Sequence, residues 1–193
     1  MADLLRDSDI RPALRRLVQG SDPLDGVVIE ELGLKKGAVR VDLAVVNGSM
    51  HAYEIKSDLD TLRRLATQAE QYSKCFDYVS LVVGPRHIKV ARRFVPRWWG
   101  IVQVTARADG PHFVVVRKAR QNPMRDARTL VELLWRADTL ALLERIGAAE
   151  GLRSKPRDVL WDRAVERLSL EEIALAVRNH LKANAGRLGL SVP

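Results

Sequence analysis

The sequence of 193 residues contains a single cysteine, Cys75, so no disulfide can form within the chain. It also lacks any cluster of His and Cys residues with the spacing of a zinc site. These absences exclude a fold stapled by disulfides or by structural zinc. The cysteine usage fits a reducing compartment.

A long apolar run is missing as well. No stretch approaches the roughly 18 consecutive apolar residues that a membrane-spanning helix needs. The first residues, MADLLRDSDIRPALRR, carry charges throughout and lack the apolar centre of a secretion signal. No internal repeat or low-complexity segment is present. We therefore expect a folded cytoplasmic protein with no membrane partner.

Charge is abundant and unbalanced, with a formal net charge of +8. Lys and Arg side chains favour contact with phosphates because such contacts release counterions. The excess is compatible with nucleic acid as a partner, and equally with a solvated basic face.

The hydrophobic pattern predicts an α/β fold. A helix at residues 3–18 is followed by β-branched runs, and Asn47-Gly48 favours a tight turn between two of them. Ser57 and Asp60 form a capping-box pattern ahead of a helical repeat at 58–75. The expected strands are Val27–Ile29, Val39–Val46, Met50–Lys56, Tyr78–Val83, Ile101–Thr105 and Phe113–Val116.

The last third of the chain has a purely helical pattern. The polar stretch Arg120–Arg128 is the best candidate for a linker. Thr129 with Glu132, and Ser169 with Glu172, are capping-box patterns, and a short helix is expected near Pro156. We predict a core over residues 1–120 and a C-terminal helical region over residues 126–186 that packs against it.

The chemistry-bearing segment is the predicted hairpin. Glu54 and Lys56 share one strand face because successive side chains alternate. A three-residue loop, Val46–Gly48, with Gly48 at positive φ would place Asp42 opposite Ala52 and diagonal to Glu54. The two carboxylates could then share a divalent cation, Mg²⁺ or Mn²⁺, and the Lys56 ammonium could orient the attacking water in phosphodiester hydrolysis.

Asp42 followed by Glu54-Ile55-Lys56 on a hairpin resembles the PD-(D/E)xK signature of restriction-endonuclease-like nucleases, with Val41 in place of the proline. The segment YEIKSDLDTLRRLATQAEQY is similar to small uncharacterised bacterial members. The resemblance implies a restriction-endonuclease-like core, made of a helix, a three-stranded antiparallel meander, a helix and a strand. An all-helical appendage would follow. The implied activity is metal-dependent hydrolysis of nucleic acid, DNA in the first place.

The resemblance also implies further site residues. Gln68 and Tyr72 match a Gln and a Tyr that some members carry on the helix after the hairpin, the Gln near the active site. Glu31 would be an additional metal ligand beside Asp42 and Glu54, with Glu30 as the alternative. The residues expected to contact nucleic acid are Arg63, Arg64, Tyr72, Arg86 and Lys89.

Other interpretations stay open at this point. Asp42, Glu54 and Lys56 could form an ion-pair ladder on a solvated sheet face, and Gln68 with Tyr72 could be ordinary packing. We expect the side chains of Trp98 and Trp99 to cover apolar surface rather than to stack on bases. One alternative function is a non-catalytic nucleic-acid-binding protein that keeps the nuclease fold; another is a structural partner subunit. DNA versus RNA and the assembly state, a homodimer included, are undecided.

Overall fold

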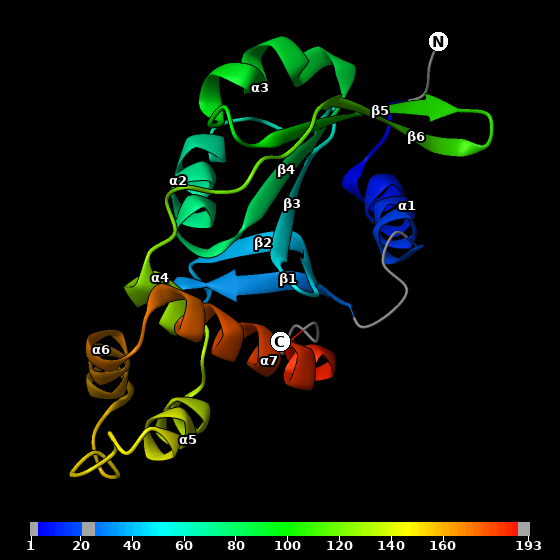
Figure 1. Ribbon diagram of the computed structural model, residues 1–193. Coiled ribbons are helices and arrows are strands. Elements are labelled where there is room, and N and C mark those ends of the chain that lie inside the picture. The colour runs from blue at the N-terminus through cyan, green and yellow to red at the C-terminus, as the bar shows by residue number, and fades with distance from the viewer. Residues whose placement is uncertain (1–3, 21–25, 189–193) are drawn as a thin grey trace.

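A computed structural model describes residues 4–20 and 26–188 and is built around a six-stranded mixed sheet (Figure 1). The strands lie in sequence order, β1-β2-β3-β4-β5-β6. The pairs β3–β4 and β4–β5 are parallel, and the other neighbours are antiparallel. The strands are β1 (Val27–Leu34), β2 (Val39–Val46), β3 (Met50–Lys56), β4 (Tyr78–Val83), β5 (Gly100–Arg107) and β6 (Gly110–Arg117).

Two helices join the parallel strands and cover one face of the sheet. The crossover from β3 to β4 contains α2 (Leu65–Cys75), and the crossover from β4 to β5 contains the 3-10 turn η2 (Pro85–His87) and α3 (Ile88–Phe94). Leu65, Tyr72 and Trp99 are fully buried in the cluster beneath these helices. The elements follow one another along the chain in the predicted order of helix, three-stranded meander, helix and strand. The prediction of a restriction-endonuclease-like core is not confirmed.

The helix α1 (Asp7–Gly20) covers the opposite face. Ile10 and Leu14 lie one turn apart on this helix and pack in a second cluster with Leu43, Ile55 and Val82. In the described residues, α1 is the sole helix in this cluster, which also includes Val104 of β5.

The C-terminal helices pack below β1 in Figure 1 and share the larger cluster with the sheet. Ser169 and Glu172 form the predicted capping box, with the Ser169 N–H donating to Glu172 Oε2 at 2.8 Å. The box predicted at Thr129 is wrong, because Asp126 is the N-cap and accepts from the Thr129 N–H at 2.7 Å. These helices are α4 (Ala127–Val131), α5 (Arg136–Arg145), α6 (Arg157–Arg167) and α7 (Leu170–Leu188).

The segment expected to be a linker is fixed to the core by one side chain. Asn122 is buried, and its Nδ2 donates to the carbonyls of Ser73 and Phe76, both at 2.7 Å. Its backbone N–H donates to the Asp77 carbonyl. The stretch therefore runs along the end of α2. The division of the chain into a core over residues 1–120 and a helical region over residues 126–186 stays a prediction.

The structure is thus an α/β protein with a six-stranded mixed sheet and, in the described residues, seven α-helices. The helix predicted at 58–75 is shorter than expected, since Ser57 and Asp60 close a turn rather than cap a helix. Residues 1–3 and 21–25 of the predicted core lie outside the described residues. None of the described helices has the length and apolar character to cross a membrane.

Candidate functional site

The hairpin between β2 and β3 brings the predicted residues together through a different turn. Its loop is three residues long, as predicted, but consists of residues 47–49, and Ala44 rather than Asp42 pairs with Ala52. Asn47 Oδ1 accepts from the Ser49 N–H at 2.8 Å, an Asx turn that needs no left-handed residue. Gly48 accordingly does not have the positive φ that we predicted.

Asp42 lies where the ladder between β2 and β3 ends. The last pair is Leu43 with Tyr53, and continuing this register sets Asp42 opposite Glu54. Asp42 Oδ2 accepts from the backbone N–H of Ile55 at 2.6 Å, and Oδ1 accepts from Arg11 Nη2 at 3.2 Å. A side chain therefore replaces the ladder bond at this point.

Glu31 faces the same region from β1 in a left-handed conformation with a φ of 52°. On either side of it, Glu30 pairs with Leu43 and Leu32 pairs with Val41. Glu31 therefore lies opposite Asp42 but does not pair with it in the ladder. Such a conformation costs on the order of 1 kcal/mol in a residue other than glycine. The ion pair between Glu31 Oε1 and Arg11 Nη1 holds the side chain at the site.

Glu54 is the most buried charged residue of the site, with 1% of the residue exposed. Its Oε1 forms an ion pair with Lys56 Nζ and accepts from Gln68 Nε2, and its Oε2 lies 2.6 Å from the Tyr72 hydroxyl. The same hydroxyl lies 2.6 Å from the Arg40 carbonyl. Both carboxylate oxygens of Glu54 are thus bonded to protein groups.

Burial and the two neighbouring carboxylates dominate the electrostatics. Desolvation, followed by the negative charge of Glu54, raises the pKa of Asp42 to about 7, against the lowering effect of the Ile55 N–H and of Arg11. Desolvation and the same Glu54 charge also raise the pKa of the Tyr72 hydroxyl well above its ordinary value. The site can therefore hold a proton on Asp42 near neutral pH.

Asp42 and Glu54 line a polar cleft of about 600 Å³ beside α1 and α2, whereas Tyr72 does not. Arg63, Arg86 and Lys89 are not part of its wall. Arg86 instead donates from its N–H and guanidinium to Asp58, in the loop after β3, and a Cβ on Gly84 would collide with that carboxylate at 2.2 Å. The predicted residues that do line the cleft are Glu31, Asp42, Glu54, Lys56, Arg64 and Gln68.

Sequence reasoning missed Arg11, which links three elements at this cleft. Arg11 Nε donates to Asp7 at 3.0 Å, and its two Nη atoms reach Glu31 and Asp42. The spacing of four between Asp7 and Arg11 is the sequence signal for a helical ion pair. The partners on β1 and β2 had no sequence signal, because they depend on how α1 crosses the sheet.

The donor set does not fit the predicted metal centre. Within residues 4–20 and 26–188, no group of three or more His, Cys, Asp and Glu side chains is arranged to hold a metal ion. The oxygens of Asp42 and Glu54 are already bonded to Arg11, Ile55, Lys56, Gln68 and Tyr72. The assignment of Glu31, Asp42 and Glu54 as ligands gains no support, and Mg²⁺ or Mn²⁺ as a cofactor stays an untested prediction.

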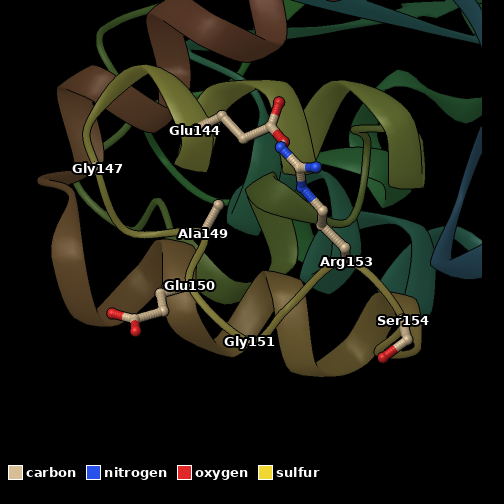
Figure 2. A pocket seen from close by; sticks show the side chains of 7 residues that line it. All are labelled: Glu144, Gly147, Ala149, Glu150, Gly151, Arg153 and Ser154. Carbon is tan, nitrogen blue, oxygen red and sulfur yellow. The ribbon is translucent and has the colours of Figure 1, made fainter.

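A separate, more open hollow of about 740 Å³ lies in the connection between α5 and α6 (Figure 2). Figure 2 shows Arg153 directed toward Glu144, and the two form an ion pair at 3.1 Å. None of the predicted site residues lines this hollow.

Fold and site together define an α/β protein whose first three strands carry a network of carboxylates that is bonded to Arg11 and Lys56. The family model described as Bacteriophage P4 protein cII matches residues 3–187, and the chain belongs to this family. Protein cII of Enterobacteria phage P4 is 29% identical over 148 residues, which cover 76% of this chain and 56% of that protein. The chain thus spans little more than half the length of this curated relative. No solved structure matches.

This membership corrects the central predictions from sequence. The assignment to the PD-(D/E)xK superfamily is wrong, because the matching family is that of protein cII. The predictions of a metal-dependent nuclease, of an enzyme and of a metal-binding hydrolase are wrong for the same reason. An acid followed at a distance by a Glu-x-Lys triplet is a short pattern. Here it forms a closed network of ion pairs and hydrogen bonds.

Proposed function

We propose that this protein binds nucleic acid without cleaving it, through a basic segment formed by residues 86–120. The single observation that carries this proposal is the distribution of charge along the chain. The basic segment has nine Lys or Arg residues and one acidic residue, Asp109, so it carries a net charge of +8. The rest of the chain has 23 basic and 23 acidic residues and is neutral.

The basic segment is made of consecutive elements that include the last two strands of the sheet. It comprises η2, α3 and the β5–β6 hairpin, which together form one end of the sheet in Figure 1. All of its basic side chains are exposed except that of Arg117, which is half-buried. They are Arg86, Lys89, Arg92, Arg93, Arg97, Arg107, Arg117, Lys118 and Arg120.

Three of these arginines lie close enough together to repel one another. Burial and then the positive charges of Arg92 and Arg120 lower the pKa of Arg117. Arg117 is held in place because its guanidinium donates to the carbonyls of Trp99 at 2.6 Å and Pro96 at 3.0 Å. A bound phosphate would relieve this repulsion, which supports a polyanionic partner.

The aromatic pair within the segment has a different role. Trp99 is fully buried and stacks on Tyr72, with ring centroids 6.0 Å apart, while Trp98 is 9% exposed. The prediction that Trp98 and Trp99 cover apolar surface is confirmed. Of the residues predicted to contact nucleic acid, Arg86 and Lys89 belong to the basic segment, whereas Tyr72 is buried against Glu54.

A binding titration tests the proposal. Fluorescently labelled 20-base-pair DNA, the same DNA as a single strand, and the corresponding RNA would be titrated with the full chain at several salt concentrations. We expect binding whose affinity falls steeply with salt, as phosphate contacts require, and no shortening of the probe. Absence of binding to all three probes at moderate salt would overturn the proposal and favour a structural partner subunit.

A further inference from the structure

We infer that an aromatic groove on the α1 face of the sheet receives unpaired bases, so that single-stranded nucleic acid is the preferred form of the partner. This inference rests on the proposed function. The groove has a volume of about 620 Å³ and lies between the second half of α1 and strands β3–β6. Small-molecule sites usually have volumes of roughly 300–1,000 Å³.

The wall of the groove contains four rings from three strands, β3, β4 and β6. His51 and Tyr53 are stacked with centroids 4.3 Å apart, and Tyr78 lies 5.7 Å from His51. Phe113 contributes the ring on β6. Stacking on such rings is how proteins bind unpaired bases without reading their sequence, because every base has a π-face.

The rings are held by contacts that leave His51 uncharged. His51 Nε2 lies 2.9 Å from Ser80 Oγ, and burial lowers the pKa of His51 to about 4. Ser80 in turn fills the space over Gly100, where a Cβ would come within 2.5 Å of its hydroxyl. The groove therefore offers neutral, fixed rings at physiological pH.

Two positively charged residues of the basic segment lie at the groove. Arg117 and Lys118 line it, and Arg117 is the arginine gathered with Arg92 and Arg120. A strand whose phosphates follow these side chains would have its bases beside the rings. A base paired in a duplex is stacked on its neighbours and cannot enter a groove of this kind.

Two adjacent valines give a matched pair of variants. Val115 is 60% exposed and lines the groove, whereas Val114 is 47% exposed and does not. Neighbouring strand residues point to opposite faces, so V115E places a negative charge in the groove and V114E places the same charge outside it. Neither change removes a buried side chain.

A second pair removes a ring. F113L takes away the β6 ring of the groove, and F94L makes the same change at an exposed phenylalanine of α3. Thermal melting would first establish that the variants are folded. Affinities would then be measured for labelled oligo-dT of 20 nucleotides and for a 20-base-pair duplex at equal salt.

Because V114E and V115E add the same negative charge to the basic segment, the comparison is made within each pair: we expect oligo-dT to bind about tenfold more weakly to V115E than to V114E, and about tenfold more weakly to F113L than to F94L. For the duplex, the two members of each pair should bind with nearly equal affinity. Light-induced crosslinking of 5-iodouracil DNA should reach Tyr53, Tyr78 or Phe113. If all four variants bound oligo-dT with equal affinity and the crosslinks lay elsewhere, the groove would not be the binding site, while the proposed function would stand. If the parent bound neither probe, the proposed function would fail together with the groove.

Discussion

The carboxylate of Asp42 accepts a hydrogen bond of 2.6 Å from the backbone N–H of Ile55, at the point where the ladder between β2 and β3 ends. This bond ties the acidic network to the sheet itself. The same carboxylate is repelled by Glu54 and attracted by Arg11. The contribution of Asp42 to the stability of the fold thus depends on pH and on the charges of Glu54 and Arg11.

Asp42→Asn should change the pH dependence of stability. The pKa of Asp42 is about 7 in the folded chain, and that of an unfolded aspartate is about 3.9. Between these values the folded state binds more protons, so the contribution of Asp42 to stability falls as pH rises. We expect the melting temperature of the variant, relative to the parent, to be higher at pH 8 than at pH 5.

The matched control for this measurement is Glu150→Gln, at an exposed carboxylate in the connection between α5 and α6. Its melting temperature should track that of the parent at both pH values. A difference for Asp42→Asn that stays constant from pH 5 to pH 8 would refute the raised pKa.

Lys56→Met should be strongly destabilising because it leaves the charge of Glu54 buried without its ion-pair partner. Loss of one member of a buried pair costs about 3–5 kcal/mol of unfolding free energy. The double variant Glu54→Gln/Lys56→Met should recover most of this loss in urea denaturation. Lys74→Met, which breaks the exposed pair with Glu70, should have little effect. Additive effects of the two substitutions would contradict the coupling.

Tyr72→Phe removes the hydroxyl that lies 2.6 Å from both Glu54 Oε2 and the Arg40 carbonyl. A buried acceptor that loses its donor costs about 1–3 kcal/mol. Tyr53→Phe is the control, since its hydroxyl has only a contact of 3.4 Å to His51. Chemical denaturation that showed equal stabilities for the two variants would mean that the Tyr72 hydroxyl does not hold the network.

Most of the helices and strands could be predicted because hydrophobic periodicity and turn residues are local signals. The odd length of the loop correctly placed the side chains of Asp42 and Glu54 on the same face of the sheet. The register was predicted wrongly, because the Asx turn at Asn47 moved the loop by one residue and shifted the pairing by two. Local signals also could not place Arg11, which acts across three elements.

The function could not be inferred from the motif. Asp42, Glu54, Lys56 and Gln68 do lie together as predicted, but their mutual bonds depend on side-chain directions and burial that spacing does not encode. The clustering of charge in residues 86–120 was visible in the sequence in part, at Arg86, Lys89, Arg92 and Arg93. Its continuation onto Arg117 and Arg120 required the β5–β6 hairpin to return beside α3.

The salt dependence of DNA binding, measured for two double variants, tests the central claim most directly. Arg92→Ala/Arg120→Ala removes two exposed charges from the basic segment, and Arg145→Ala/Arg167→Ala removes two exposed charges from the C-terminal helices. Each phosphate contact contributes about 0.9 to the slope of log affinity against log salt for duplex DNA. We predict a slope reduced by about 2 for the first variant and the parent's slope for the second. Equal slopes for the parent and both variants would contradict the account.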